Sequence, residues 1–127
     1  MSQDKSKAVV RRAIEILDSR DPEALEEAWS PEMAAMWRAV LASLPFSEHR
    51  IKITNLVAEG DKVAIRVATS GVHTGEWEGV PPTGRSWTNT GMAFLRVEDG
   101  KVVAFEPLFD ELGHLKQLGA TINPGQE

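Results

Sequence analysis

The first 45 residues carry apolar side chains at the spacing that is typical of amphipathic helices. In the first segment, apolar residues recur at intervals of three and four, at Val10, Ala13, Ile14 and Leu17. Two further helices are predicted to begin at Asp21-Pro22 and at Ser30-Pro31, because each pair combines an N-cap residue with proline at the first helical position. Pro45 ends the third predicted helix.

From residue 51 onward the pattern changes to alternation of apolar and polar residues, which is typical of strands. It predicts a four-stranded antiparallel meander, with strands over about 51–57, 63–73, 86–97 and 101–109. Asp99-Gly100 is a strong signal for the last hairpin. A final short helix carries Leu112, Leu115 and Leu118. Helices followed by a strand meander indicate an α+β fold, in which a curled sheet leaves one open end for a ligand.

Composition and charge narrow the choice of partners. A chain of 127 residues is expected to form a single domain, 1–127. The net charge of −5 and the absence of a basic cluster argue against nucleic acid and anionic membrane as partners. No apolar run approaches the roughly 20 residues that span a bilayer, and no leader pattern opens the chain. We therefore expect a cytoplasmic protein.

The sequence gives no sign of a metal or organic cofactor. Cysteine is absent, which excludes a thiolate nucleophile and a cysteine-based zinc site. The three histidines follow no metal-binding spacing, and no glycine-rich phosphate loop is present. We expect His49 and His114 to lie at the surface, and any catalysis to need neither a metal nor a cofactor.

A set of ordered motifs runs from about residue 51 to residue 119. The most specific are Gly71-Val72-His73-Thr74-Gly75-Glu76-Trp77 and Gly79-Val80-Pro81-Pro82-Thr83-Gly84-Arg85. The set also includes residues 56–64, 94–101, 109–113 and 117–119. In these motifs the chain resembles the SnoaL-like polyketide cyclase family, within the nuclear transport factor two-like superfamily.

The resemblance implies a cone-shaped α+β barrel. Its N-terminal helices would pack against a strongly curved, mainly antiparallel sheet of four to six strands that encloses a pocket. It also implies a cofactor-independent lyase or isomerase that acts on a hydrophobic carbonyl compound by aldol-type cyclisation or isomerisation. In such cyclases an aspartate near the end of the last strand is the general acid/base, and Asp110 matches it. Phe105, Glu106 and Pro107 replace the family's usual His-Trp-Asp-like run. This departure favours a second hypothesis, a non-catalytic binding module for a hydrophobic small molecule.

Asp110 and His73 are the catalytic candidates. The apolar neighbours of Asp110 would desolvate a carboxyl group and shift its titration toward neutral pH, as proton transfer requires. The alternative is that Asp110 only caps the last helix. His73 continues the face of the second strand and would serve as a proton shuttle or hydrogen-bond donor at the pocket mouth. The alternative is a structural histidine that ties the loop 75–85 to the strand.

Six further residues are candidates for substrate binding. Tryptophan offers a broad apolar wall with one N–H donor, methionine offers an adaptable wall, and polar side chains can hold a substrate oxygen or one of its ends. The candidates are Trp37, Trp77, Met33, Met36, Asn89 and Glu106. Ordinary core packing is the alternative for the tryptophans, and a solvent-facing or dimer-facing position is the alternative for Glu106. Asn89 would donate to an oxyanion if it points inward.

Two further hypotheses depend on strand parity. Epoxide hydrolysis needs two acids and an arginine, which Glu106, Asp110 and Arg66 could supply, although Arg66 falls on the face opposite His73.

The third strand is apolar on both parities, so its outward face needs a cover. We expect that cover to be a second copy of the chain, in a homodimer formed through the sheet. The alternative cover is the chain's own segment 118–127.

Overall fold

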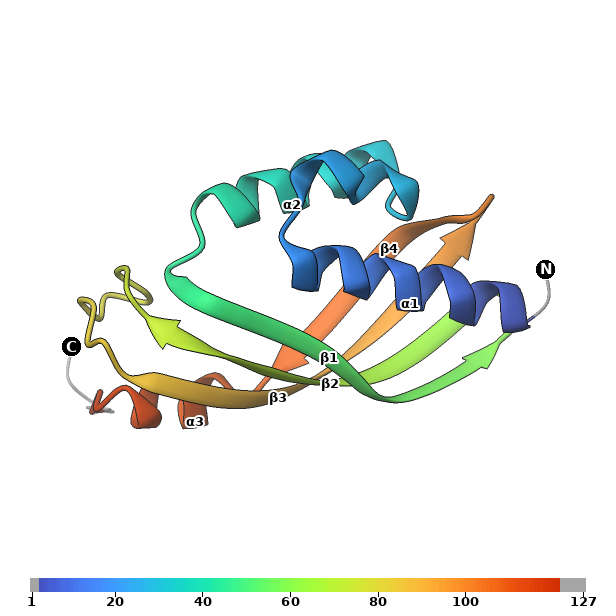
Figure 1. Ribbon diagram of the computed structural model, residues 1–127. Helices are drawn as coiled ribbons and strands as arrows, with labels where there is room; N and C mark the ends of the chain where they lie inside the picture. The colour runs from blue at the N-terminus through green and yellow to red at the C-terminus, as the bar shows by residue number, and fades with distance from the viewer. Residues whose placement is uncertain (1–2, 122–127) are drawn as a thin grey trace, which may run out of the picture.

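The computed structural model describes residues 3–121 and confirms an α+β architecture. Three helical segments come first, α1 (Gln3–Ser19), the 3₁₀ helix η1 (Pro22–Glu27) and α2 (Pro31–Ala42). Four strands and one helix follow, β1 (Phe46–Glu59), β2 (Lys62–His73), β3 (Ser86–Glu98), β4 (Lys101–Phe109) and α3 (Glu111–Gln117). The strands form one antiparallel sheet in the order β1-β2-β3-β4, which curves without closing. Figure 1 shows α1 and α2 over one face of this sheet, and α3 at the end where β4 stops.

The two predicted N-caps form as expected. Asp21 Oδ1 accepts a hydrogen bond from the backbone N–H of Glu23 at 3.0 Å, and Ser30 Oγ accepts one from Met33 at 3.3 Å. In each case proline occupies the first turn, where its missing N–H costs nothing. The segment after Asp21 is a short 3₁₀ helix.

The hairpin turn between β3 and β4 also matches its sequence signal. Asp99 and Gly100 have φ angles of 50° and 76°, so both central residues are left-handed, as the tightest hairpin turns require. This turn fixes the register in which Val97 lies opposite Val102.

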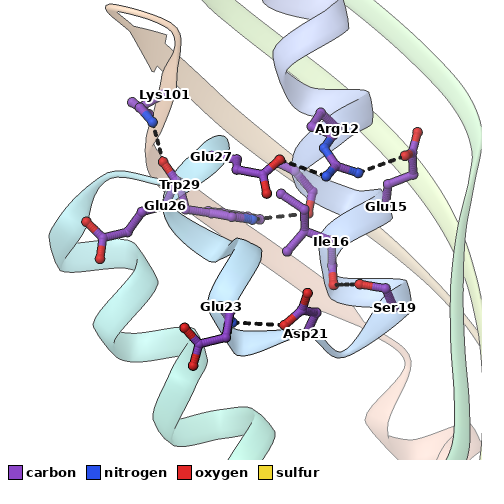
Figure 2. A network of polar contacts seen from close by, with 11 residues as sticks. Arg12, Glu15, Ile16, Ser19, Asp21, Glu23, Glu26, Glu27, Trp29 and Lys101 are labelled. Carbon is purple, nitrogen blue, oxygen red and sulfur yellow. Dashed lines mark hydrogen bonds and ion pairs between the residues drawn. The ribbon is translucent and has the colours of Figure 1, made fainter.

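The core lies where α1 and η1 cover the inner face of the sheet. Val63, Leu95, Val97 and Val102 are at most 2% exposed there. The ring of Trp29 is fully buried, and its Nε1–H donates to the carbonyl of Ala13 at 3.1 Å (Figure 2). Backbone hydrogen bonds join the chain around Trp29 to Val102, so η1 is tied to both α1 and β4. We call this covered part of the inner face the closed end.

Surface ion pairs surround the same junction. Arg12 contacts Glu15 and Glu27 at 3.1 and 2.8 Å, and Lys101 donates to the carbonyl of Glu26 (Figure 2). These side chains are about half exposed, so each pair adds little to stability, typically about 0–1 kcal/mol.

Strand β1 begins five residues earlier than the alternation predicts. It runs from Phe46, and its pairing with β2 is interrupted twice, between Ser47 and Arg50 and between Ile53 and Asn55. Glu48, inside the first interruption, has a φ of 51°. These irregularities break the alternation on which the prediction relied. The additional length places Phe46 opposite His73, at the end of the sheet away from the core.

Candidate ligand pocket at the open end of the sheet

The inner face of the sheet changes in character along its length. At the closed end its inward positions are aliphatic, whereas at the other end β2 and β3 present Thr69, His73, Trp87 and Asn89. Neither α1 nor α2 is drawn over this second end in Figure 1. We call it the open end.

Helix α3 is held against the open end by the side chain of Gln117, which makes the backbone hydrogen bonds that a neighbouring strand would make. Strand β4 stops at Phe109, opposite Gly91, which leaves the first residues of β3 without a neighbour on that side. Gln117 fills this place, because its amide accepts from the backbone N–H of Thr88 at 2.8 Å and donates to the carbonyl of Thr88 at 2.6 Å. The hydrogen bonds of this sheet edge are thus satisfied, and α3 acquires a fixed position.

A pocket of about 240 Å³ lies between the open end, α3 and the loop 74–85. Its aromatic walls are close together, with ring centroids 4.7 Å apart for Phe46 and Trp87 and 4.1 Å apart for Trp87 and His114. Trp77 from the loop lies 4.3 Å from His114. The lining residues are Phe46, Thr69, Trp77, Trp87, Asn89, Phe109, Glu111 and His114.

Two strand glycines allow the aromatic walls to lie flat on the sheet. A Cβ atom at Gly71 would lie 2.9 Å from Cζ2 of Trp87, and a Cβ at Gly91 would overlap the ring of Phe109. Any other residue at these positions would push a ring away from the strand. The shape of the pocket therefore depends on both glycines.

Buried nitrogen atoms without partners gather at this end of the molecule. Within residues 3–121, five buried side-chain nitrogens lack a hydrogen-bond partner. Four of them are His49 Nδ1, His73 Nε2, Trp87 Nε1 and His114 Nε2, and the fifth belongs to Trp37. A buried polar group without a partner typically costs about 1–3 kcal/mol, so such a concentration is informative. The pocket-lining N–H groups can bind an acceptor oxygen that enters the pocket.

The prediction that His49 and His114 lie at the surface is wrong. His114 is 4% exposed, because α3 turns it toward the inner face four residues before the buried Leu118. Burial and the neighbouring His73 and His49 lower the pKa of His114. His49 is half-buried, and burial and the nearby Arg20 lower its pKa as well.

His73 is buried completely and ties the loop 74–85 to β2. Its Nδ1 lies 3.2 Å from the backbone N–H of Thr83 and 3.0 Å from the Thr83 hydroxyl. Backbone hydrogen bonds to Gly84 and Arg85 complete the attachment. His73 has no exposed surface, and it is not one of the residues that line the pocket. Its position at the mouth of the pocket, expected from parity, is therefore wrong, and the structural alternative describes its contacts.

Asp110 is exposed and caps α3. Its Oδ1 accepts from the backbone N–H of Gly113 at 2.9 Å. Asp110 borders a polar depression whose other lining residues include Ser70, Thr88 and Thr90, which lie on the outer face of the sheet. The apolar surroundings expected for Asp110 are absent, because Leu108, Phe109 and Leu112 are 79%, 40% and 50% exposed.

The six predicted binding residues separate into two groups. Trp77 and Asn89 line the pocket, and Asn89 points inward. Trp37 packs edge-on against Trp29 and Phe105, Met33 packs on the core, and Met36 is 43% exposed. Glu106 lies opposite Phe94 and borders a groove on the outer face of the sheet, together with Arg66. Neither Glu106 nor Arg66 is among the residues that line the pocket.

Sequence reasoning missed several residues that line the pocket. These are Phe46, Thr69, Trp87, Phe109, Glu111 and His114. Trp87 shares the parity of Asn89, and His114 lies four residues before Leu118, so two of them carried a usable signal. Among the described residues, no three of the His, Asp and Glu side chains are placed to hold a metal ion.

Comparison with known proteins agrees with this architecture. The model of the SnoaL-like polyketide cyclase family matches residues 7–118. The chain belongs to this family. Membership of the SnoaL-like family supports a role as a small-molecule enzyme or binding protein.

No described helix has the length and apolar character needed to cross a membrane.

Solved structures of similar proteins come from several bacteria. IdmH of Streptomyces antibioticus, a proposed polyketide cyclase, is 27% identical over 94% of this chain and 100% of its own, with a TM-score of 0.73. AclR of Streptomyces galilaeus, a proposed hydroxylase, is 25% identical over 96% of this chain and 89% of its own, with a TM-score of 0.79. TsrD of Streptomyces laurentii, at 24% identity and a TM-score of 0.82, covers 95% of this chain and 99% of its own and supports the fold alone. No protein of curated function matches the sequence.

Proposed function

We propose that this SnoaL-like protein binds a hydrophobic carbonyl compound in the open-end pocket and acts on it by cofactor-independent acid/base chemistry. The observation that carries the proposal is the composition of the pocket. Aromatic rings form its walls, and the buried N–H groups of Trp87 and His114 have no partner within residues 3–121. Such a site suits a flat apolar molecule with an acceptor oxygen.

The chemistry proposed is an aldol-type cyclisation or an isomerisation, as the family suggests. Both begin when a base removes a proton from the carbon next to the carbonyl, which leaves an enolate oxygen that hydrogen-bond donors stabilise. We assign the base to Asp110, which is exposed directly after β4 and lies in the chain between the pocket-lining Phe109 and Glu111. Asn89 links the pocket to Asp110, because it lines the pocket and its amide nitrogen lies 3.3 Å from the backbone oxygen of Asp110. His73 is assigned the task of holding the loop 74–85.

Exchange of hydrogen for deuterium tests this chemistry before the natural substrate is known. The probe is 1-indanone in D₂O, whose protons on the carbon next to the carbonyl are removed by a base and replaced by deuterons. The wild-type protein should accelerate this exchange, as measured by proton NMR. Asp110→Asn should reduce the rate by about 10²-fold or more, the usual effect of losing a general base. Asparagine also caps helices well, so the variant should keep α3.

The neighbouring carboxylate provides a matched control. Glu111 lines the pocket, and Glu111→Gln should leave the exchange largely unchanged. Loss of exchange in Glu111→Gln with full activity in Asp110→Asn would move the base to Glu111. A chelator should have no effect, because the proposed step uses only side chains and the substrate's own acidity.

The alternative function is binding without catalysis. It is favoured by one observation, that Asp110 is exposed and already engaged as the cap of α3. In that case 1-indanone would bind in the pocket, but the protein would not accelerate the exchange.

We also propose that the protein pairs with a second copy through the outer face of the sheet. Four apolar side chains are 57–79% exposed on this face, namely Val57, Met92, Phe94 and Leu108. They border a groove of about 450 Å³. Exposed apolar surfaces that are continuous in this way usually mark an interface. The alternative cover, the segment 118–127, lies partly outside the described residues.

Light scattering at micromolar concentration tests the pairing. The wild type should have twice the chain mass of 14.0 kDa. Phe94→Lys should give the single-chain mass, and its charge would lie opposite Glu106 in the folded chain, which favours a stable monomer. Thr90→Lys, on the polar part of the same strand, is the control and should remain paired. A wild type of single-chain mass would contradict the proposal.

A further inference from the structure

The side-chain amide of Asn89 has a defined orientation. Its Oδ1 accepts from the backbone N–H of Thr90 at 2.8 Å. Its Nδ2 lies 3.3 Å from the backbone carbonyl oxygen of Asp110 and 3.4 Å from Nδ1 of His114. The opposite orientation would place an oxygen against a carbonyl oxygen and an N–H against an N–H. The hydrogen-bond network therefore assigns Nδ2 as the donor to His114.

This orientation determines which nitrogen of His114 carries the proton. A neutral imidazole has one N–H and one acceptor nitrogen. Because Nδ1 accepts from Asn89, the hydrogen must be on Nε2. Burial, together with the neighbouring His73 and His49, lowers the pKa of His114, which favours the neutral ring.

The Nε2–H of His114 has no partner among the described residues, although it is buried. The ring is held between two indoles, with centroid distances of 4.3 Å to Trp77 and 4.1 Å to Trp87. His114 therefore presents a fixed donor in the wall of the pocket. A ligand that lacks an acceptor oxygen would leave this donor unpaired, which disfavours its binding relative to a ligand of the same shape that carries one.

We infer that His114 recognises the ligand as a neutral hydrogen-bond donor through Nε2–H, and that Asn89 is the positioning residue that selects this tautomer. The inference rests on the proposed function, because it assumes that a ligand enters this pocket. The inference adds a specificity to the proposed function: the site should prefer a ligand with an acceptor oxygen, such as a ketone, to the same carbon skeleton without that oxygen.

The tautomer can be measured without any ligand. Nitrogen-15 NMR of the imidazole ring at pH 8 should show His114 protonated at Nε2 in the wild type. In Asn89→Asp the carboxylate can only accept, so the proton should move to Nδ1. Asn55→Asp makes the same change of charge at an exposed position of β1 and should leave the His114 signals unchanged. Protonation at Nδ1 in the wild type, or no change in Asn89→Asp, would overturn the inference.

Binding of a matched pair of probes tests the recognition itself. The probes are 1-indanone and indane, which differ in the carbonyl oxygen, and the indole N–H signals of the tryptophans report their binding by NMR. The wild type should bind 1-indanone about tenfold more tightly than indane, the usual effect of one buried hydrogen bond. Asn89→Asp and His114→Phe should lose this preference and still bind indane.

The binding results distinguish a failure of the donor role of His114 from a failure of the proposed pocket. Equal binding of both probes by the wild type would overturn the donor role of His114 and leave the proposed pocket intact. If neither probe shifted the indole N–H signals of the wild type, the result would contradict both the proposed pocket and the donor role of His114.

Discussion

Trp29 and Trp87 are both buried tryptophans of this fold, and they show how its two ends differ. Trp29 is 0% exposed at the closed end, where Trp37 and Phe105 pack edge-on against its ring, and its indole N–H donates to the carbonyl of Ala13. Trp87 is 4% exposed, but its indole N–H has no partner among the described residues. At the closed end the N–H of Trp29 is paired, as buried polar groups usually are, and among residues 3–121 the neighbouring Trp37 holds the one unpaired buried side-chain nitrogen outside the open end. The open end leaves donors unpaired among the described residues, which costs stability, and we propose that a ligand pairs with them.

The largest expected effect comes from removing the two rings. Trp29→Ala should lower the free energy of unfolding by about 3–5 kcal/mol, the usual loss for a large aromatic side chain in a core. Trp87→Ala should lower the free energy of unfolding clearly less, because the Trp87 ring lines the pocket and its N–H makes no hydrogen bond to the part of the chain that the structure describes. Urea unfolding measures both values. Equal losses would mean that the open end contributes to the core as much as the closed end.

The flat packing of Phe109 on β3 gives the second prediction. Gly91→Ala should cost about 1–3 kcal/mol, because the new methyl group overlaps the Phe109 ring and forces it off the strand. Thr90→Ala, at the exposed neighbouring position, should change stability by no more than about 0.5 kcal/mol. If Gly91→Ala were as mild as its control, the ring of Phe109 would be free to move and the pocket wall would not be fixed.

The two ends also differ in how far the sequence could predict them. The closed end follows from simple alternation, since Val63, Ile65 and Val67 on β2 and Leu95 and Val97 on β3 are buried as their parity indicates. Asp99-Gly100 fixes the hairpin, and the two N-caps fix the helix starts. Local rules decide these features, so a single sequence contains them.

The open end depends on irregular structure that no local rule gives. The bulge between Ser47 and Arg50 brings Phe46 and His49 to the site, and alternation cannot anticipate it. The position of α3 depends on the long-range contact of Gln117 with Thr88. Asp110, which the resemblance indicates as the general acid/base, shows the limit of parity, because β4 ends one residue before it and its side chain turns to cap α3.

Acidification should weaken the open end selectively. Unfolded histidine binds a proton near pH 6.5, whereas the folded His49 and His114 bind theirs only at lower pH. The unfolded chain therefore holds more protons than the folded chain as the pH falls through this range, and stability decreases. The melting temperature should fall between pH 7 and pH 5.

Substitution of these two histidines identifies them as the cause. The double variant His49→Gln, His114→Gln should flatten the dependence of the melting temperature on pH in this range. Asp18, paired with Arg50, has a lowered pKa, so its stabilising effect is present above its ordinary value of 3.8 and is lost only at lower pH. A wild-type profile that is level between pH 7 and pH 5 would contradict the burial of these rings.

The smallest effect, and the sharpest form of the comparison, is expected from replacing each tryptophan with phenylalanine. Both substitutions remove the same ring atoms and one N–H. At Trp29 the lost N–H was bonded to Ala13, so Trp29→Phe should cost more by roughly 1 kcal/mol, the typical net value of one hydrogen bond. At Trp87 the lost N–H was buried without a partner, and relief of that penalty should offset much of the lost packing. Trp87→Phe should therefore change the free energy of unfolding by less than about 1 kcal/mol in urea titrations. A cost at Trp87 as large as that at Trp29 would show that its indole N–H is already satisfied in solution, and that the open end is no less complete than the core.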